Sequence, residues 1–324
     1  MAGFAATSLE DAQTWCVALS GGPDSLALTA AAAAVRPTTA LIVDHGLQAQ
    51  SAAVAETARE QAMDLGCIAA RVLRVQVGAT GGPEAAARNA RYPALQAARD
   101  GAPVLLAHTL DDQAETVLLG LGRGSGPRSI AGMRPADPPW FRPLLGVRRS
   151  TTHQVCAELG LTAWDDPHNS DHRFTRVRLR AEVLPLLEDV LGGGVAEALA
   201  RTASALREDT DALDALALDA LGPDALSPDA LSPDALGRAS SAGGGGLEVA
   251  AIADLHGALR RRGLRAWLLA GGATDLTDQQ IRSVDALVTA WRGQGGVAVG
   301  CDTPRTRLFA ERRAGVLTLR TEPV

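Results

Sequence analysis

Apolar runs and helical stretches alternate along the first half of the chain. The apolar runs are TWCVALS (14–20), TTALIVDH (38–45), AARVLRVQV (69–77) and PVLLAHT (103–109). Segments rich in helix-forming residues separate them, such as 51–66 and 83–101. This βαβ pattern predicts an α/β fold, with a parallel sheet covered by helices and ligands bound at the carboxyl ends of the strands.

The second half of the chain follows a different pattern. Helical stretches at 151–160, 175–190 and 195–209 are followed by ALGPDALSPDALSPDALG (220–237), a pentad repeat. Proline at every fifth position is incompatible with a regular helix, so the repeat predicts an extended, solvated linker. Helical patterns at 255–272 and 277–293, followed by the alternating segments VAVGCD and GVLTLR, predict a smaller, mainly helical α+β domain.

Composition indicates in which cellular compartment we expect the protein. The N-terminus has no basic segment, and no run of about 18 apolar residues occurs, so we expect a cytoplasmic protein without a membrane span. The four cysteines are far apart and form no CxxC pair, which predicts neither a disulfide framework nor a zinc site.

The formal net charge of −6 is unevenly distributed. Six aspartates lie within 211–236, a segment without arginine, whereas 123–180 carries ten arginines against five acidic residues. The global charge is therefore no argument against a nucleic-acid partner, and a basic surface in the middle of the chain stays open.

Between the first predicted strand and helix lies SGGPD (20–24), a strand-to-helix turn. Glycines allow the backbone to approach a ligand, and the free N–H groups at a helix start favour a phosphate. The chain contains no lysine, which excludes the GxxxxGK[ST] phosphate loop. A carboxylate beside a phosphate, here Asp24, implies a bridging divalent cation, so we expect Mg²⁺. The alternative is an ordinary helix start capped by Asp24 or Ser25.

Acidic residues begin another predicted helix, in HTLDDQAETVLLGLGRGSG (108–126). Helical spacing places Glu115 one turn from Asp111 and Asp112, on one face. We interpret these acids as a carboxylate pair facing Mg²⁺ or a cationic substrate, with favourable placement in a first helical turn as the alternative. Arg123 ends this helix and is a candidate for binding phosphate or RNA.

Polar clusters follow three of the four predicted strands. They are SGGPDS (20–25), Asp44-His45-Gly46, and His108-Thr109 with the two aspartates after it. Because the carboxyl ends of parallel strands share one edge of the sheet, we expect these clusters to meet at one rim.

In this arrangement the residues resemble a known family. SGGPDS, VDHGL (43–47), EAAARNARY (84–92), HTLDDQAETVLLGLGRGSG, RPLL (142–145) and WDDPHNSDHRFTRVRLRAEVLPLL (164–187) occur in the order typical of bacterial tRNA(Ile)-lysidine synthases, members of the PP-loop ATP pyrophosphatase superfamily. SGGxDS is specific only to the superfamily, and the later blocks indicate the lysidine enzymes. The resemblance implies a Rossmann-like PP-loop catalytic domain at 1–190, a helix and Asp/Pro linker at 191–246, and a small substrate- or tRNA-binding domain at 247–324.

The activity that the resemblance implies has two steps. ATP adenylates the C2 oxygen of the wobble cytidine of CAU-anticodon tRNA(Ile), and the ε-amine of free L-lysine then displaces AMP to form lysidine. The implied ATP and Mg²⁺ site contains Ser20, Gly21, Gly22, Asp24, Ser25, Asp44, His45, Gly46, His108 and Arg123, with Asp111 as a second metal candidate. Catalytic roles fall to Asp24, Asp44, Asp112 and Glu115, and the last two are implied to bind lysine.

Arginines provide candidate contacts to the nucleic acid. By the resemblance, those that would contact ATP or tRNA phosphates are Arg88, Arg91, Arg176, Arg178 and Arg180. For Arg88 and Arg91, a solvated helix face is the alternative. The basic cluster at 260–265 in the second domain has the same two interpretations: contact with the tRNA, or a solvated helix face.

Two rival functions stay open at this point. A PP-loop RNA thiolase normally needs paired cysteines, which the chain lacks, and a noncatalytic ATP-gated tRNA-binding protein would bind both ligands without releasing pyrophosphate. The chain has one histidine before its acidic pair, where many lysidine enzymes have two. The oligomeric state is also open, a homodimer included.

Overall fold

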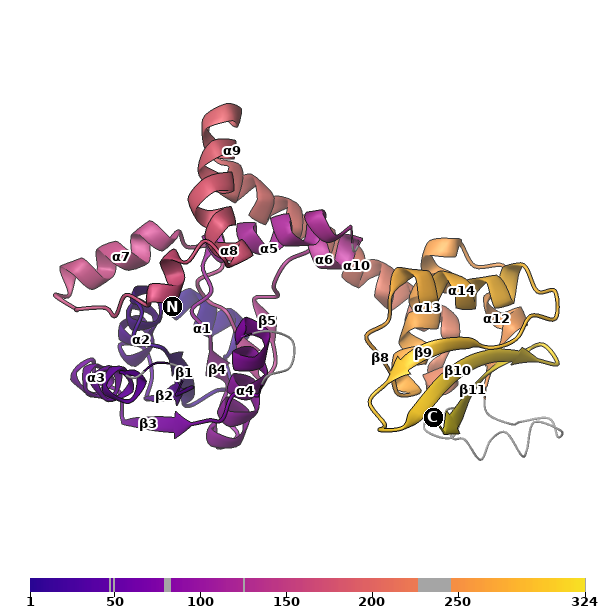
Figure 1. Cartoon of the computed structure of the whole chain (residues 1–324), viewed down its shortest axis with the longest axis horizontal. Helices are drawn as coiled ribbons and strands as arrows, with labels where there is room; N and C mark the ends of the chain where they lie inside the picture. Colours follow the sequence, from indigo (N-terminus) through magenta and orange to yellow (C-terminus); the bar gives the residue numbers. More distant parts are fainter. Residues whose placement is uncertain (47, 49, 79–82, 125, 227–245, 324) are drawn as a thin grey trace. The chain divides into compact units, whose positions relative to one another are not determined.

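Two compact units make up the chain. The computed structural model describes residues 1–46, 48, 50–78, 83–124, 126–226 and 246–323 (Figure 1). The first unit comprises Met1–Gly124 with Ser129–Ser204, and the second Ser125–Arg128 with Ala205–Val324. The predicted boundaries at 190 and 246, which separate domains by their expected roles, stay a prediction. Nowhere in the described ranges does a helix combine the length and apolar character needed to cross a bilayer.

A six-stranded sheet in the order β3-β2-β1-β4-β6-β5 forms the centre of the first unit. Its strands are β1 (Trp15–Leu19), β2 (Thr38–Asp44), β3 (Ala69–Arg74), β4 (Val104–Leu105), β5 (Ala136–Asp137) and β6 (Trp140–Phe141). Every pairing is parallel except that of β5 with β6. Four of these strands lie within the four apolar runs, which confirms the predicted parallel α/β sheet.

Helices cover both faces of this sheet. The first unit contains α1 (Ala2–Ser8), α2 (Pro23–Ala33), α3 (Ser51–Asp64), α4 (Pro83–Ala98), α5 (Leu110–Arg123), α7 (Arg149–Glu158), α8 (Thr175–Arg178) and α9 (Leu184–Leu191), with the short turns η1 (Pro167–Ser170) and η2 (Leu179–Val183). Leu19 and Ile42 pack towards α2 and α3, whereas Ala18 and Leu41 pack towards α4 on the other face (Figure 1). Burial on both faces explains why these strands are almost continuously apolar.

The division between the units falls within helix α10 (Val195–Leu221). The sequence predicted this helix only to residue 209, but alanine and leucine, both strong helix formers, continue between the aspartates. The described part of the pentad repeat is also helical rather than extended: α10 reaches Leu221, and the 3-10 turn η3 (Pro223–Leu226) follows. The rest of the repeat, 227–237, lies outside the described residues.

The second unit is an α+β structure, as predicted. Its antiparallel sheet has the order β7-β11-β10-β9-β8, and its core includes Trp267, Leu287 and Leu308. The elements are β7 (Leu247–Glu248), α12 (Val249–Ala253), α13 (Gly257–Ala270), β8 (Ala273–Thr274), α14 (Asp278–Thr289), β9 (Val297–Cys301), β10 (Thr306–Arg313) and β11 (Val316–Pro323), and α6 (Pro127–Ile130) lies at the division of the units. Strand β10 was not predicted from the sequence.

Three arginines of the basic cluster at 260–265 are held in ion pairs, and Arg260 and Arg262 have the shortest contacts. Arg260 is buried against Asp285 at 2.5 Å, and Arg262 lies 2.8 Å from Asp214. These two side chains therefore stabilise the second unit from within, which favours the structural alternative for them.

Helix α5 passes very close to the chain at Ser129, and this contact yields a prediction. A Cβ atom added to Gly120 would lie 2.7 Å from the Ser129 carbonyl carbon, so Gly120→Ala should lower the free energy of unfolding by about 1–3 kcal/mol. Gly122→Ala, on the same helix with open space around the new methyl group, should instead raise it by up to about 1 kcal/mol. Urea unfolding of both variants measures the difference, and equal effects would contradict this account of α5 packing.

Candidate functional site

The loop between β1 and α2 is closed by its own serines. The Ser25 hydroxyl donates to the Gly22 carbonyl oxygen at 2.9 Å and accepts from the Ser20 backbone N–H at 3.2 Å. Gly21 has φ +84°, a left-handed conformation that favours glycine. Helix α2 begins after Gly22, which has no side chain to cap the first turn. Its N–H groups are therefore free to bind an anion, and the serines hold the loop in shape for it.

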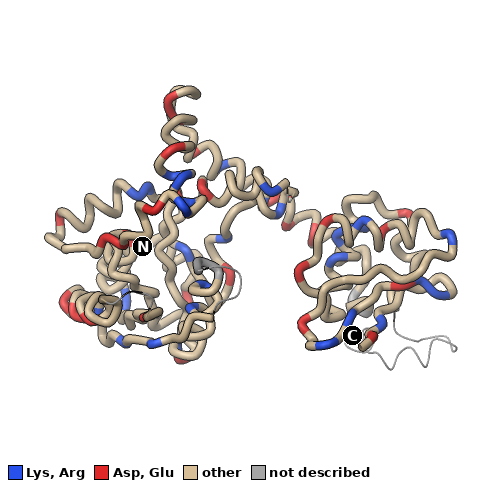
Figure 2. The backbone as a smooth tube through the Cα atoms, viewed as in Figure 1, with Lys and Arg blue, Asp and Glu red and all other residues tan. Residues whose placement is uncertain are grey.

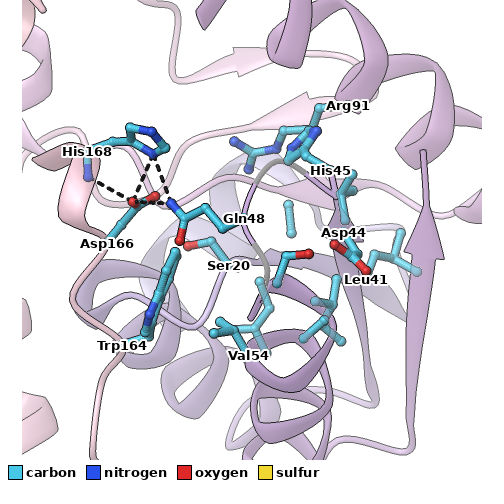
Figure 3. Close-up of a pocket in the computed structure, with 16 residues that line it drawn as sticks. Ser20, Leu41, Asp44, His45, Gln48, Val54, Arg91, Trp164, Asp166 and His168 are labelled. Carbon is cyan, nitrogen blue, oxygen red and sulfur yellow. Dashed lines mark hydrogen bonds and ion pairs between the residues drawn. The ribbon is translucent and has the colours of Figure 1, made fainter. Parts of the chain in front are cut away.

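A cavity of about 260 Å³ opens beside this loop. Leu41 and Val54 contribute apolar surface to its lining, and Ser20, Asp44 and His45 contribute polar groups (Figure 3). The Asp44 carboxylate accepts the Gly46 N–H at 3.0 Å, which fixes the turn after β2. An apolar cavity with a few polar groups, next to a phosphate-binding helix start, matches what a nucleoside needs.

Another segment lines the same cavity from across the loop. The Gln48 amide donates to Asp166 at 3.1 Å and lies 3.0 Å from His168 Nδ1 (Figure 3). Trp164 lies beside them, and its backbone N–H donates to the Gly21 carbonyl oxygen at 2.9 Å. These contacts attach the segment after α7 directly to the anion-binding loop.

A larger cavity, of about 790 Å³, lies on the other side of Ser20 and Trp164. Among its lining residues are Asp24, which follows β1, and His108 and Asp112, which follow β4. Arg91 lines both cavities. The three predicted polar clusters therefore do meet at one rim of the sheet, and this rim can accommodate a nucleotide together with a second substrate.

Acids and arginines form one network beside the larger cavity. The Asp112 carboxylate caps α5 by accepting from the Thr109 backbone N–H at 2.8 Å, and it lies 2.6 Å from the Arg149 guanidinium. Glu115 is fully buried, with Arg180 at 2.8 Å, Arg149 at 3.4 Å and Arg176 at 3.9 Å. It lines a smaller neighbouring cavity. Figure 2 shows arginine and acidic positions close together around α5 and α8.

Asp24 and Asp111 join the same network. Asp24 lies 3.4 Å from Arg149 and accepts from the Thr152 hydroxyl. Burial raises the pKa of Asp24, while Thr152 and Arg149 act in the opposite direction. Asp111 accepts the backbone N–H of Arg149 at 2.7 Å and lies 3.4 Å from Arg148. Within the described residues no group of three or more His, Cys, Asp and Glu side chains could by itself hold a metal ion.

Several predicted site residues lie outside the two larger cavities. Arg88 stacks on Tyr92 at 5.1 Å, and Arg178 is exposed in a pair with Glu182 at 3.0 Å. Arg123 is exposed at the end of α5, where Gly124 forms a left-handed cap. Arg176 lies near Glu115 rather than in either cavity. Of these side chains, those of Arg88, Arg123 and Arg178 are exposed at the surface.

Four residues of the site carry no individual signal in the amino-acid sequence: Arg149, Trp164, Gln48 and His168. Arg149 follows RPLL in the chain, and Trp164 and His168 lie within the block 164–187, so the family resemblance included or bordered them. No spacing rule marks them individually, because contacts such as those of Arg149 with Asp112 and of Gln48 with Asp166 join residues 37 and 118 positions apart in the chain.

His108 yields a prediction about pH. Burial lowers its pKa to about 4, and its Nδ1 atom is buried with no hydrogen-bond partner among the residues that the structure describes. Between about pH 6.5 and 4 the unfolded state therefore binds a proton at His108 while the folded state does not. The free energy of unfolding is unaffected by this proton above pH 6.5 and decreases as the pH falls towards 4. Unfolding experiments should show up to about 3 kcal/mol less acid destabilisation in His108→Gln than in the wild type. An identical pH profile for the variant would contradict burial of a neutral imidazole.

Comparison with known proteins agrees with this geometry. Residues 3–187 match the PP-loop domain family, and residues 247–315 match the TilS substrate binding domain. The tRNA(Ile)-lysidine synthase of Mycolicibacterium paratuberculosis is 69% identical over 321 residues, which cover 99% of this chain and 95% of the relative. The enzyme of the same name from Mycobacterium tuberculosis H37Rv is 69% identical over 323 residues, with the same coverage.

A solved structure shares the fold. The U34-tRNA thiolase NcsA from Methanococcus maripaludis, solved with its [4Fe-4S] cluster, superposes with a TM-score of 0.50 and 17% identity, over 62% of this chain and 74% of its own. At this identity the likeness concerns the fold alone. In this chain Cys16, Cys67 and Cys156 are buried, and burial raises the pKa of each thiol.

Proposed function

We propose a reaction from one premise: the chain belongs to the tRNA(Ile)-lysidine synthase family. It is an AMP-forming carbon–nitrogen ligase that joins free L-lysine to C2 of cytidine 34 in CAU-anticodon tRNA(Ile). ATP first adenylates the C2 oxygen and pyrophosphate leaves; the ε-amine of lysine then attacks C2, AMP leaves, and the product is lysidine. Family membership favours this reaction over an RNA thiolase or a noncatalytic tRNA-binding protein. The meeting of the anion-binding loop with the acids of α5 at one rim is the observation that supports it.

The nucleotide would lie across the loop between β1 and α2. Ser20, Gly21, Gly22 and Ser25 would hold the pyrophosphate at the start of α2, where N–H groups and the helix dipole favour negative charge. Asp44, His45 and Gly46 would line the nucleoside side. His108, at the rim, and Arg123, exposed at the end of α5, are proposed to complete this site.

The loop provides one suitable ligand for Mg²⁺, the carboxylate of Asp24. The ion usually binds one or two carboxylates together with substrate phosphates, and Asp24 lies in the first turn of α2, where those phosphates are expected. Asp24 is therefore the main proposed metal ligand, whereas Asp111, occupied by Arg149 and Arg148, is a weaker one. A bound Mg²⁺ would neutralise charge that develops on the phosphates.

Lysine is proposed to bind at Asp112 and Glu115. Asp112 lines the larger cavity, so its carboxylate is the one that can meet an ammonium group directly. Glu115, behind it, would act through the arginines that both acids share. Acidic side chains suit an ammonium-bearing substrate, because their negative charge attracts the amine.

The tRNA would be bound by arginines of the first unit together with the second unit. Arg88, Arg91, Arg176, Arg178 and Arg180 are the proposed phosphate contacts, and binding should weaken as salt is raised. We also propose a cytoplasmic location, where tRNA, ATP and lysine are present together, and a homodimer stays open.

Transfer of labelled lysine tests this function. The assay uses ATP, Mg²⁺ and CAU-anticodon tRNA(Ile), with a C34U transcript and a methionine tRNA as controls. The proposal expects label only on the cytidine-bearing tRNA(Ile), together with AMP and pyrophosphate. Pyrophosphate release without label would support the adenylating loop and overturn the role of the α5 acids.

A further inference from the structure

One arginine side chain lies among three carboxylates of the proposed site. The Arg149 guanidinium is 2.6 Å from Asp112, 3.4 Å from Glu115 and 3.4 Å from Asp24. Only 17% of its side chain is exposed, and its backbone N–H is fixed to Asp111 at the first residue of α7. Its positive charge therefore occupies the position where an ammonium substrate would meet Asp112.

The charges in this network are already balanced. Three acids, Asp24, Asp112 and Glu115, are paired with three arginines, Arg149, Arg176 and Arg180. An added ammonium ion gains little from a neutral cluster and is repelled by the guanidinium nearest to its carboxylate. A lysine site at Asp112 therefore requires that one arginine withdraw.

Arg149 is the arginine whose contacts suit this role. Arg180 also lines the larger cavity, but it lies 2.8 Å from Glu115 and 3.7 Å from Asp112, so it mainly serves the buried acid. Among the ion pairs of the described residues, Arg149 joins Asp24 of the anion-binding loop to Asp112 and Glu115 of α5. One side chain thus touches the proposed nucleotide site and the proposed lysine site.

We propose that Arg149 is an exchangeable internal cation that blocks Asp112 until nucleotide binds and so makes lysine binding depend on ATP. This inference rests on the proposed function and adds an order of binding to it. Phosphates at the start of α2 attract the guanidinium, and a cation at Asp24 competes for that carboxylate. Both effects weaken the hold of Arg149 on Asp112, and the coupling is reciprocal, so lysine also tightens nucleotide binding. Arg149 is a positioning and specificity residue in this scheme.

Calorimetric titration of L-lysine into the full chain tests the coupling. The titration is done alone and with α,β-methylene-ATP and Mg²⁺, which fill the nucleotide site without reaction. The wild type should bind lysine at least about 5-fold, and up to about 150-fold, more tightly with the nucleotide. In Arg149→Met, affinity without nucleotide should rise, and the dependence on nucleotide should fall to about twofold or less. A purely structural role for Arg149 predicts weaker lysine binding instead.

Two further variants keep the test decisive. Arg149→Gln removes the charge but retains a hydrogen-bond donor for one carboxylate, so it carries the test if Arg149→Met does not fold. Arg59→Met changes an arginine of α3 that pairs with Glu56 on the same helix, and it should keep the nucleotide dependence of the wild type.

The outcomes separate this inference from the proposed function. Lysine transfer to tRNA by the wild type, with unchanged nucleotide dependence in folded Arg149→Gln, would overturn the inference alone. Absence of both lysine binding and lysine transfer in the wild type would overturn the proposed function and the inference with it.

Discussion

Replacing Asp24 with asparagine is expected to slow pyrophosphate release by about 100- to 1,000-fold, the cost typical of losing one preorganised electrostatic group at a reacting centre. The carboxylate lies in the first turn of α2, and the amide that replaces it is a poor ligand for Mg²⁺. The rate should be measured with CAU-anticodon tRNA(Ile) at several Mg²⁺ concentrations, and part of the loss should be recovered at high Mg²⁺.

A matched variant separates this effect from a general change in charge. Asp64→Asn removes an exposed carboxylate near the end of α3 and should leave the rate within about twofold of the wild type. A similar Mg²⁺ dependence in Asp24→Asn and the wild type would contradict the role of Asp24 as a metal ligand.

Replacing Glu115 with glutamine should weaken both the fold and the use of lysine. Glu115 is fully buried among Arg149, Arg176 and Arg180, so loss of its charge leaves those arginines partly unpaired. Breaking such a buried pair lowers the free energy of unfolding by about 3 kcal/mol. The KM for lysine should rise about tenfold or more, as expected when a charged hydrogen-bonding partner is lost, and the Kd for tRNA should change little.

Urea unfolding, lysine kinetics and tRNA filter binding measure the three quantities. Glu158→Gln is the control, because Glu158 is exposed and accepts from Gln154 on the same helix, at 2.8 Å. Unchanged lysine kinetics in folded Glu115→Gln would contradict the assignment of Glu115 to the lysine site.

Two elements of the structure, β10 and the second half of α10, were not predicted from the periodicity of the sequence. Strand β10 reads TRLFAERR, with charged residues on four of its eight positions, and is a strand because it pairs with β9 and β11. The preference for strand depends on such neighbours more than on the residue types. Helix α10 passes the predicted end because its aspartates lie between alanine and leucine, which sustain the helix.

The amino-acid sequence alone determined the α/β class, the strands that carry the site and the glycine loop at the start of α2. These features depend on short-range patterns: continuous apolar runs for strands buried on both faces, and glycine where φ is positive. They placed Ser20, Asp44 and His108 at strand ends, and hence at one rim. Only the tertiary structure decided which charges meet there. Arg149 reaches Asp24 across 125 positions of the chain, and the balance of acids and arginines depends on how α5, α7 and α8 pack together, because an ion pair is set by distance in space and leaves no periodicity in the sequence.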